Sequence, residues 1–293
     1  MRILSFIAGI AILHRASAFA TSSPGLSTVA LPSRSLMSAN GDRGLLAARR
    51  NSSAIRATAS SDTSNPGRFD ASAVGKYLFA IGTQLSLFYL GFSALDWAVA
   101  KLPFKIPLAA NFFLFYAMAL KSRVMNPLCN NRPKPKTLET SDSPKRKMPT
   151  WTPPGPVFPI VWLLIIGPLR ALTSSMVYAT TGSYATPAIF ALLLHLSIGD
   201  VWNTINNVER RYGVAVVGVL CVWLSKAFAA YSYYKVNPLA GKLLSIALVW
   251  LTIASALVTR TWQLNPDPET GKPEPLYPVT GKVNTKIEWF EGK

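Results

Sequence analysis

Three ionisable residues, Arg170, Asp200 and Lys226, fall inside apolar stretches long enough to cross a membrane. Such groups are rare in lipid and usually pair with one another or line a cavity. We expect Asp200 and Arg170 to form a buried pair at the polar end of a pocket, with Lys226 able to meet an acidic group of a ligand. The simpler alternative is that Asp200 hydrogen-bonds Asn203 and Thr204.

His195 has a candidate role of its own. Together with Gly199, Trp202 and Asn206 it falls on one stripe of a predicted helix. A histidine in that place could ligate haem iron axially, and the alternative is a hydrogen-bonded packing residue. The sequence contains no nucleophile–base triad, no metal-ligand spacing and no phosphate-binding loop. We therefore predict no catalytic residue, no metal site and no required cofactor.

The stretch from Trp151 to Trp162, called the elbow below, holds four prolines and two tryptophans in twelve residues. Proline fixes φ and removes a backbone donor, so this is a rigid entry to the apolar run that follows. Pro159 is tolerated in the first turn of a helix, where N–H groups have no internal partner. Phe158 and Trp162 then share one helix face. The elbow thus delivers an aromatic pair to the start of a membrane-length helix.

The elements that would carry these residues are membrane spans. Half of the residues are hydrophobic and the mean hydropathy is +0.27. The apolar residues come in runs of roughly 17–25, the length of a transmembrane helix. We predict an all-α bundle with five spans, or six if both of the first two runs cross. The runs cover 77–99, 106–121, 157–180, 187–206, 214–234 and 239–262.

Basic residues gather in particular connections between these runs. The loop 121–150 and the turn 209–211 are basic, whereas 173–187 carries no charge. Under the positive-inside rule, the elbow, the 209–213 turn and the C-terminus face one side of the membrane. Because the net charge of +17 sits in the N-terminal region, one loop and the tail, a basic face for nucleic acid is not indicated.

The N-terminal region has the composition of a targeting sequence. Residues 1–20 form a short apolar run that ends at Ala16-Ser17-Ala18-Phe19-Ala20, a signal-peptidase pattern. Residues 21–68 are rich in Ser, Ala and Arg, as transit peptides are. This pair resembles the bipartite presequence of algae with secondary plastids, which predicts a plastid membrane. The alternative is a secreted or endomembrane protein.

The predicted organisation has three parts: a presequence at 1–68, a transmembrane domain at 69–265 and a polar C-terminal tail at 266–293, which we expect to be poorly ordered. The two cysteines, Cys129 and Cys221, lie in different kinds of segment. We expect both to be unpaired thiols.

The elbow resembles the signature of the TspO/MBR family (tryptophan-rich sensory protein, translocator protein, peripheral benzodiazepine receptor), Trp-x-Pro-Pro-x-x-x-Phe-Pro-x-x-Trp. Every position of it is present, from Trp151 through Pro153 and Pro154 to Trp162. Residues 150–265 are similar to the family in other respects too. The resemblance implies a five-helix bundle in which the elbow enters the second helix.

The resemblance also implies a pocket between the helices that takes haem or porphyrins, lined by aromatic and apolar side chains. Flat tetrapyrroles suit aromatic walls, since stacking and burial both favour them. The alternative is that the tryptophans anchor the helices at the membrane interface. The ligand-binding residues carried over by position, with His195 added, are Trp151, Pro154, Phe158, Trp162, His195, Trp202, Trp223 and Trp250.

Some positions depart from the family pattern. Gly199 and Thr204 stand where the third helix often has Asn and Pro, and Val258 stands where the fifth has Asn. The sterol-recognition pattern of animal members is absent from the fifth helix, so cholesterol is not the predicted ligand.

The sequence and the resemblance together predict a multi-pass membrane protein that binds a hydrophobic ligand, a tetrapyrrole, for transport, buffering or stress signalling. One alternative is a redox catalyst that degrades porphyrin in light, an activity the resemblance brings with it. Another is a structural or assembly factor without a ligand. Partners are the bilayer, the ligand and, as in relatives, a second copy of the chain.

Overall fold

The computed structural model describes residues 67–128, 130–131, 146–268 and 270–291, all within one compact unit, 62–293. The predicted presequence, 1–68, lies almost wholly outside the described residues, as does Cys129. Within the described ranges the chain forms helices and two isolated β-bridges. Five of these helices are long and apolar enough to cross a membrane. The predicted all-α transmembrane bundle is therefore confirmed.

The spans follow one another in the order of the predicted apolar runs. The first is α3 (Ala71–Val99), followed by the shorter α4 (Leu108–Lys121) and the 3₁₀ turn η2 (Ser122–Met125). The remaining elements are α6 (Val157–Ile160), the π-helical η3 (Val161–Ile166), α7 (Gly167–Thr181), α8 (Pro187–Thr204), the π-helical η4 (Ile205–Glu209), α9 (Tyr212–Val236), α10 (Pro238–Ser245), α11 (Ala247–Leu264) and α12 (Glu288–Glu291).

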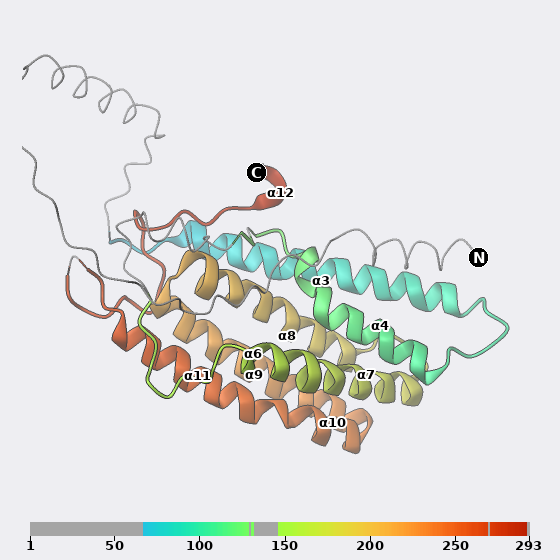
Figure 1. Cartoon of the computed structure of the whole chain (residues 1–293). Helices are drawn as coiled ribbons and strands as arrows, with labels where there is room; N and C mark the ends of the chain where they lie inside the picture. Colours follow the sequence, from blue (N-terminus) through green and yellow to red (C-terminus); the bar gives the residue numbers. More distant parts are fainter. Residues whose placement is uncertain (1–66, 129, 132–145, 269, 292–293) are drawn as a thin grey trace, which may run out of the picture. The chain divides into compact units, whose positions relative to one another are not determined.

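Two ends of the bundle can be defined from the connections (Figure 1). The elbow, the 209–212 turn and the end of α11 share one end, here called the elbow side; the Asn265 amide donates to the Lys147 carbonyl there at 2.8 Å. The 182–186 turn and the 236–238 turn mark the far side. The common location of the elbow, the basic turn and the last span's end agrees with the orientation predicted from charge.

A shorter return segment follows α3, which is the first of the five helices long enough to cross a membrane. Helix α3 begins on the elbow side, where Asp70 pairs with Arg211 at 3.3 Å, and ends on the far side, where Asp96 bonds Tyr184. Helix α4 therefore starts on the far side and must return. At 1.5 Å per residue its 14 residues cover only about 21 Å. The return is completed by η2 and by the non-helical segment from Asn126, packed between α3 and α8.

The irregular start of the second predicted span has a local cause. In η3 the Gly167 N–H bonds the carbonyl of Trp162, five residues back. In the same pattern the Leu163 carbonyl would accept a hydrogen bond from the N–H of residue 168, but Pro168 has no N–H. The hydroxyl of Tyr116 on α4 donates to that carbonyl instead, at 2.8 Å. The missing N–H of Pro168 is thus accommodated by the π-helical segment that precedes it.

The far-side turn between α7 and α8 is organised by a carboxylate from α3. Asp96 accepts hydrogen bonds from the Ser183 hydroxyl at 2.6 Å, the Tyr184 N–H at 2.7 Å and the Ala185 N–H at 2.9 Å. Burial raises the pKa of the Tyr184 phenol, whose hydroxyl donates to Asn111 on α4. These bonds hold α3 and α4 to the turn that connects the second and third spans of the resemblance.

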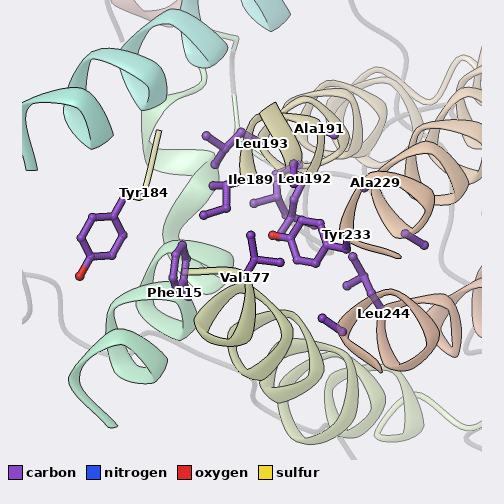
Figure 2. Close-up of a cluster of buried hydrophobic side chains, with 14 of the residues drawn as sticks. Phe115, Val177, Tyr184, Ile189, Ala191, Leu192, Leu193, Ala229, Tyr233 and Leu244 are labelled. Carbon is purple, nitrogen blue, oxygen red and sulfur yellow. The ribbon is translucent and has the colours of Figure 1, made fainter. Parts of the chain in front are cut away.

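The main core lies in the far half of the bundle. Figure 2 shows the side chains of Val177, Ile189, Leu192 and Tyr233 converging between the helices, all of them fully buried. Helix α7 packs against α4 and α10, α8 packs against α3 and α9, and α9 also packs against α11. The half nearest the elbow has a second, smaller cluster around Val201 and Leu128.

The described part of the C-terminal tail is packed on the bundle, so the expectation of poor order is wrong for these residues. Arg211 donates to the carbonyls of Val279 and Val283 at 3.3 and 2.6 Å. The tail pairs with Phe69 and Leu128 in the two bridges and ends beside α3 (Figure 1). Composition missed this because the anchors are backbone carbonyls, which every sequence supplies.

Candidate functional site

The elbow places its aromatic residues at different depths. Trp151 and Pro154, in the part of the elbow that precedes the helix, are both exposed. Phe158 is half-buried and makes an edge-to-face contact with Trp250 of α11, with ring centroids 5.8 Å apart. The indole N–H of Trp250 is buried without a hydrogen-bond partner among the described residues. The helices that correspond to the second and fifth of the predicted five-helix bundle thus meet through the predicted aromatic residues.

Trp162 continues this aromatic surface inward. Its ring is half-buried and lies 5.3 Å from the guanidinium carbon of Arg170, a cation–π distance. Arg170 is eight residues further along the same span, which is about 12 Å of helix rise. One predicted aromatic residue and one predicted intramembrane charge are therefore in contact.

His195 is fully buried, and both of its ring nitrogens have protein partners. Its Nε2 lies 3.0 Å from Nη2 of Arg170, and its Nδ1 lies 3.2 Å from the Val222 carbonyl and 3.1 Å from the Ser225 hydroxyl. No ring nitrogen remains for iron, so axial ligation is not supported in this arrangement. The alternative of a hydrogen-bonded packing residue describes it correctly.

The predicted Asp200–Arg170 pair is not formed as a direct contact. Asp200 accepts a hydrogen bond from the amide of Gln84 on α3 at 2.7 Å and acts on Arg170 only as a nearby charge. Of the contacts in the alternative, Thr204 bonds Asp200 through the backbone, because its hydroxyl donates to the Asp200 carbonyl at 3.5 Å. Sequence reasoning did not single out Gln84 as a site residue, although it is the one amide side chain in the first apolar run.

Gln84 belongs to a buried polar network around the end of α4. Its amide also donates to the Ser122 carbonyl at 2.8 Å, and its oxygen accepts from Asn126 at 2.9 Å. Arg123 of η2 donates to Asn203 on α8 at 2.6 Å. The Gln84 amide thus supplies a hydrogen bond to a backbone carbonyl at the point where α4 ends, as lipid requires.

Lys226 of α9 is fully buried and its ammonium nitrogen has no hydrogen-bond partner among the described residues. It lies within electrostatic range of both His195 and Arg170. The structure therefore gathers two of the three predicted intramembrane charges with the predicted histidine, whereas the Asp200 carboxylate is bonded by Gln84.

Two predicted site tryptophans instead join helices. The Trp202 indole donates to the Ala215 carbonyl of α9 at 3.0 Å and packs so closely on Gly218 that a Cβ there would lie 2.8 Å from its ring. The Trp223 indole donates to the Thr252 hydroxyl of α11 at 3.0 Å. Trp202 is therefore a contact between α8 and α9, and the glycine of α9 makes room for it.

One basic side chain of the loop before the elbow is packed at the elbow side of the bundle. Arg146 donates to the Asn206 side chain at 3.0 Å and lies over the ring of Tyr212 at 5.1 Å. Burial lowers the pKa of its guanidinium. Part of the positive charge of the 121–150 loop is thus packed against the end of the span that α8 begins.

A separate apolar groove of about 710 Å³ lies between α3 and the start of α8. Its lining includes Leu85, Tyr89 and Phe190, none of which the sequence singles out. The groove faces outward from the bundle and does not include the predicted tryptophans. Among the described residues, no group of acidic, histidine and cysteine side chains could hold a metal ion.

Comparison with known proteins agrees with this architecture. A model of the TspO/MBR family matches residues 131–263. The translocator protein of Homo sapiens is 30% identical over 120 residues, which is 40% of this chain and 70% of that protein. The chain belongs to the TspO/MBR family. It is a multi-pass membrane protein.

Other TspO/MBR relatives are more distant in sequence. The tryptophan-rich sensory protein of Cereibacter sphaeroides is 28% identical over 117 residues, 40% of this chain and 72% of that protein. Protein CrtK of Rhodobacter capsulatus is 26% identical over 122 residues, 41% of this chain and 76% of that protein. The family match begins after α3 and α4, so α3 lies outside the matched residues.

Proposed function

We propose that this TspO/MBR protein binds a tetrapyrrole between its helices and serves in its transport, buffering or stress signalling. The aromatic surface made by Phe158, Trp162 and Trp250 carries the proposal. These rings come from the elbow and the last span, are half-buried, and continue into a buried basic group at Arg170. A flat ligand with an apolar ring and acidic substituents matches such a surface.

The absence of a nucleophile–base arrangement among the described residues favours binding over group chemistry. The neighbouring π-helical segments η3 and η4 support the location, since such segments are frequent at functional sites. Trp202 and Trp223 contribute to the frame that holds the helices and not to the proposed surface, because their N–H groups are committed to neighbouring helices.

The binding experiment is a titration of the purified full chain with haem and with protoporphyrin, followed by tryptophan fluorescence. We expect saturable quenching, and a loss of affinity of about ten-fold or more in Trp162→Ala, because stacking and area burial are removed together. Trp97→Ala is the matched control, since Trp97 is an exposed tryptophan of α3 away from the elbow. Absence of quenching in the wild type would favour a structural factor without ligand. Illumination of the complex followed by analysis of products separates binding from porphyrin degradation.

We further propose a plastid membrane as the location, on the composition of residues 1–68. The test is imaging of a fluorescent fusion to the C-terminus in an alga with a secondary plastid. A plastid pattern that is lost on removal of residues 21–66 is expected. An endoplasmic-reticulum pattern for the full chain contradicts the proposal.

A further inference from the structure

Three basic side chains from three helices meet inside the bundle. Arg170 comes from α7, His195 from α8 and Lys226 from α9. Their exposed fractions are 9%, 1% and 0%. Arg170 touches His195 at 3.0 Å, and Lys226 lies within electrostatic range of both. All three residues of this basic cluster belong to helices long and apolar enough to cross a membrane.

The hydrogen bonds of His195 fix its form. The Val222 carbonyl can only accept, so the proton on His195 resides on Nδ1. Nε2 is then an acceptor and takes a hydrogen bond from Arg170. His195 is therefore a neutral imidazole that positions the guanidinium, and the nitrogen donors that the cluster leaves without a partner belong to Arg170 and Lys226.

Within the described part of the chain, no acidic side chain forms an ion pair with the basic cluster. The Lys226 Nζ and the Arg170 Nε are buried without hydrogen-bond partners among the described residues. Asp200 is the nearest acid that acts on Arg170, yet its carboxylate is bound by Gln84, and no described ion pair links the two. Buried nitrogen donors without an acceptor are costly, so an acidic group of a ligand would be stabilised by binding to them.

We propose that Arg170 and Lys226 bind the carboxylate of an amphipathic ligand whose apolar body lies on the aromatic surface of the elbow. This inference rests on the proposed function and adds how the ligand is oriented. A carboxylate accepts several hydrogen bonds and would satisfy both unpartnered donors. The ligand's acidic end thereby points into the bundle and its apolar end toward the elbow side.

The geometry allows one ligand to reach both regions. Trp162 touches the Arg170 guanidinium, and Phe158 with Trp250 lies one helical turn nearer the elbow side. From Phe158 to Arg170 the helix rises about 18 Å, comparable with the length of a tetrapyrrole that carries propionate arms. The apolar groove between α3 and α8 lies elsewhere and offers no basic residue.

The test compares protoporphyrin IX with its dimethyl ester on the purified full chain, by tryptophan fluorescence. We expect the free acid to bind about ten-fold or more tightly than the ester. In Lys226→Met this preference should disappear through loss of acid affinity, with ester affinity unchanged. Lys235→Met, which alters an exposed lysine of the same helix, should bind both probes as the wild type does. The thermal midpoint of Lys226→Met without ligand should not fall, because a lone buried cation is removed.

Two results would overturn the inference while leaving the proposed function standing. One is equal affinity of the wild type for acid and ester. The other is an unchanged acid preference in Lys226→Met. If neither probe binds the wild type, the proposed function and the carboxylate site fail together. The acid–ester comparison in the wild type remains decisive even if a variant folds poorly.

Discussion

The hydrogen bond from Tyr116 to the Leu163 carbonyl offers a sharp test of how the second span is built. Pro168 removes the N–H that this carbonyl would otherwise take, and the Tyr116 hydroxyl replaces it at 2.8 Å. In lipid no water can substitute for a lost donor. Tyr116→Phe should therefore lower the free energy of unfolding by about 1–3 kcal/mol, the cost of a carbonyl left unsatisfied on the lipid-facing surface.

A double-mutant cycle isolates that bond from the packing of the ring. Pro168→Ala restores a backbone N–H that can reach the Leu163 carbonyl, so Tyr116→Phe should cost less than about 0.5 kcal/mol in this background. The coupling energy is then about 1–2 kcal/mol. Both phenylalanine variants keep the ring that packs on Gly167.

The assay is unfolding of the purified full chain in mixed micelles by added denaturing detergent, followed by tryptophan fluorescence. Tyr89→Phe is the matched control. Among the described residues the exposed Tyr89 hydroxyl makes no hydrogen bond that the variant would break, so stability should change by less than about 0.5 kcal/mol. Additive effects of Tyr116→Phe and Pro168→Ala, within about 0.3 kcal/mol, would show that the hydroxyl does not replace the missing N–H.

Three further predictions concern other contacts. Asp96→Ala removes three charge-assisted hydrogen bonds to the 183–185 turn. It should lower the free energy of unfolding in detergent by about 3–5 kcal/mol and speed amide exchange at the turn. Unchanged amide exchange would contradict this role of Asp96. Gly218→Ala should destabilise by about 1–3 kcal/mol because its Cβ meets the Trp202 ring, whereas Gly199→Ala, with open space around it, should be neutral or stabilising; equal thermal midpoints would refute this. Burial in the docked tail raises the pKa of the Glu274 carboxyl, so docking favours its protonated form. Docking of the tail should therefore weaken as the pH rises from the usual carboxyl pKa through the raised one. Limited proteolysis of the tail between pH 5 and pH 8 should show this trend in the wild type and lose it in Glu274→Gln; a trend of the opposite sign would refute the assignment.

Much of the fold was predictable from the sequence because lipid imposes strong local rules. Apolar runs of span length become helices, since only internal hydrogen bonds satisfy the backbone there. The elbow entered its helix at Val157 with Pro159 in the first turn, as proline chemistry requires. The basic turn and the elbow share one side, as the charge pattern predicts. The family could also be recognised from the sequence, because the six fixed positions of the elbow signature are all present and the signature is specific.

The site was less predictable, because partner choice depends on which helices touch. The sequence marks Arg170, Asp200 and Lys226 as costly in lipid but does not say which of them meet. The tertiary structure decided that α7, α8 and α9 bring Arg170 to His195 and Lys226, while α3 supplies Gln84 to Asp200.

The same limit applies to the tryptophans and to the tail. An indole can line a pocket or join two helices, and only the packing of α8 on α9 assigned Trp202 to the second role. The tail's composition is polar, yet Arg211 holds it through backbone carbonyls that no pattern of side chains reveals. Side-chain types and spacing determined the membrane-spanning fold, since lipid acts on each segment locally. Contacts between segments far apart in sequence determined the site, since they depend on how the whole bundle packs.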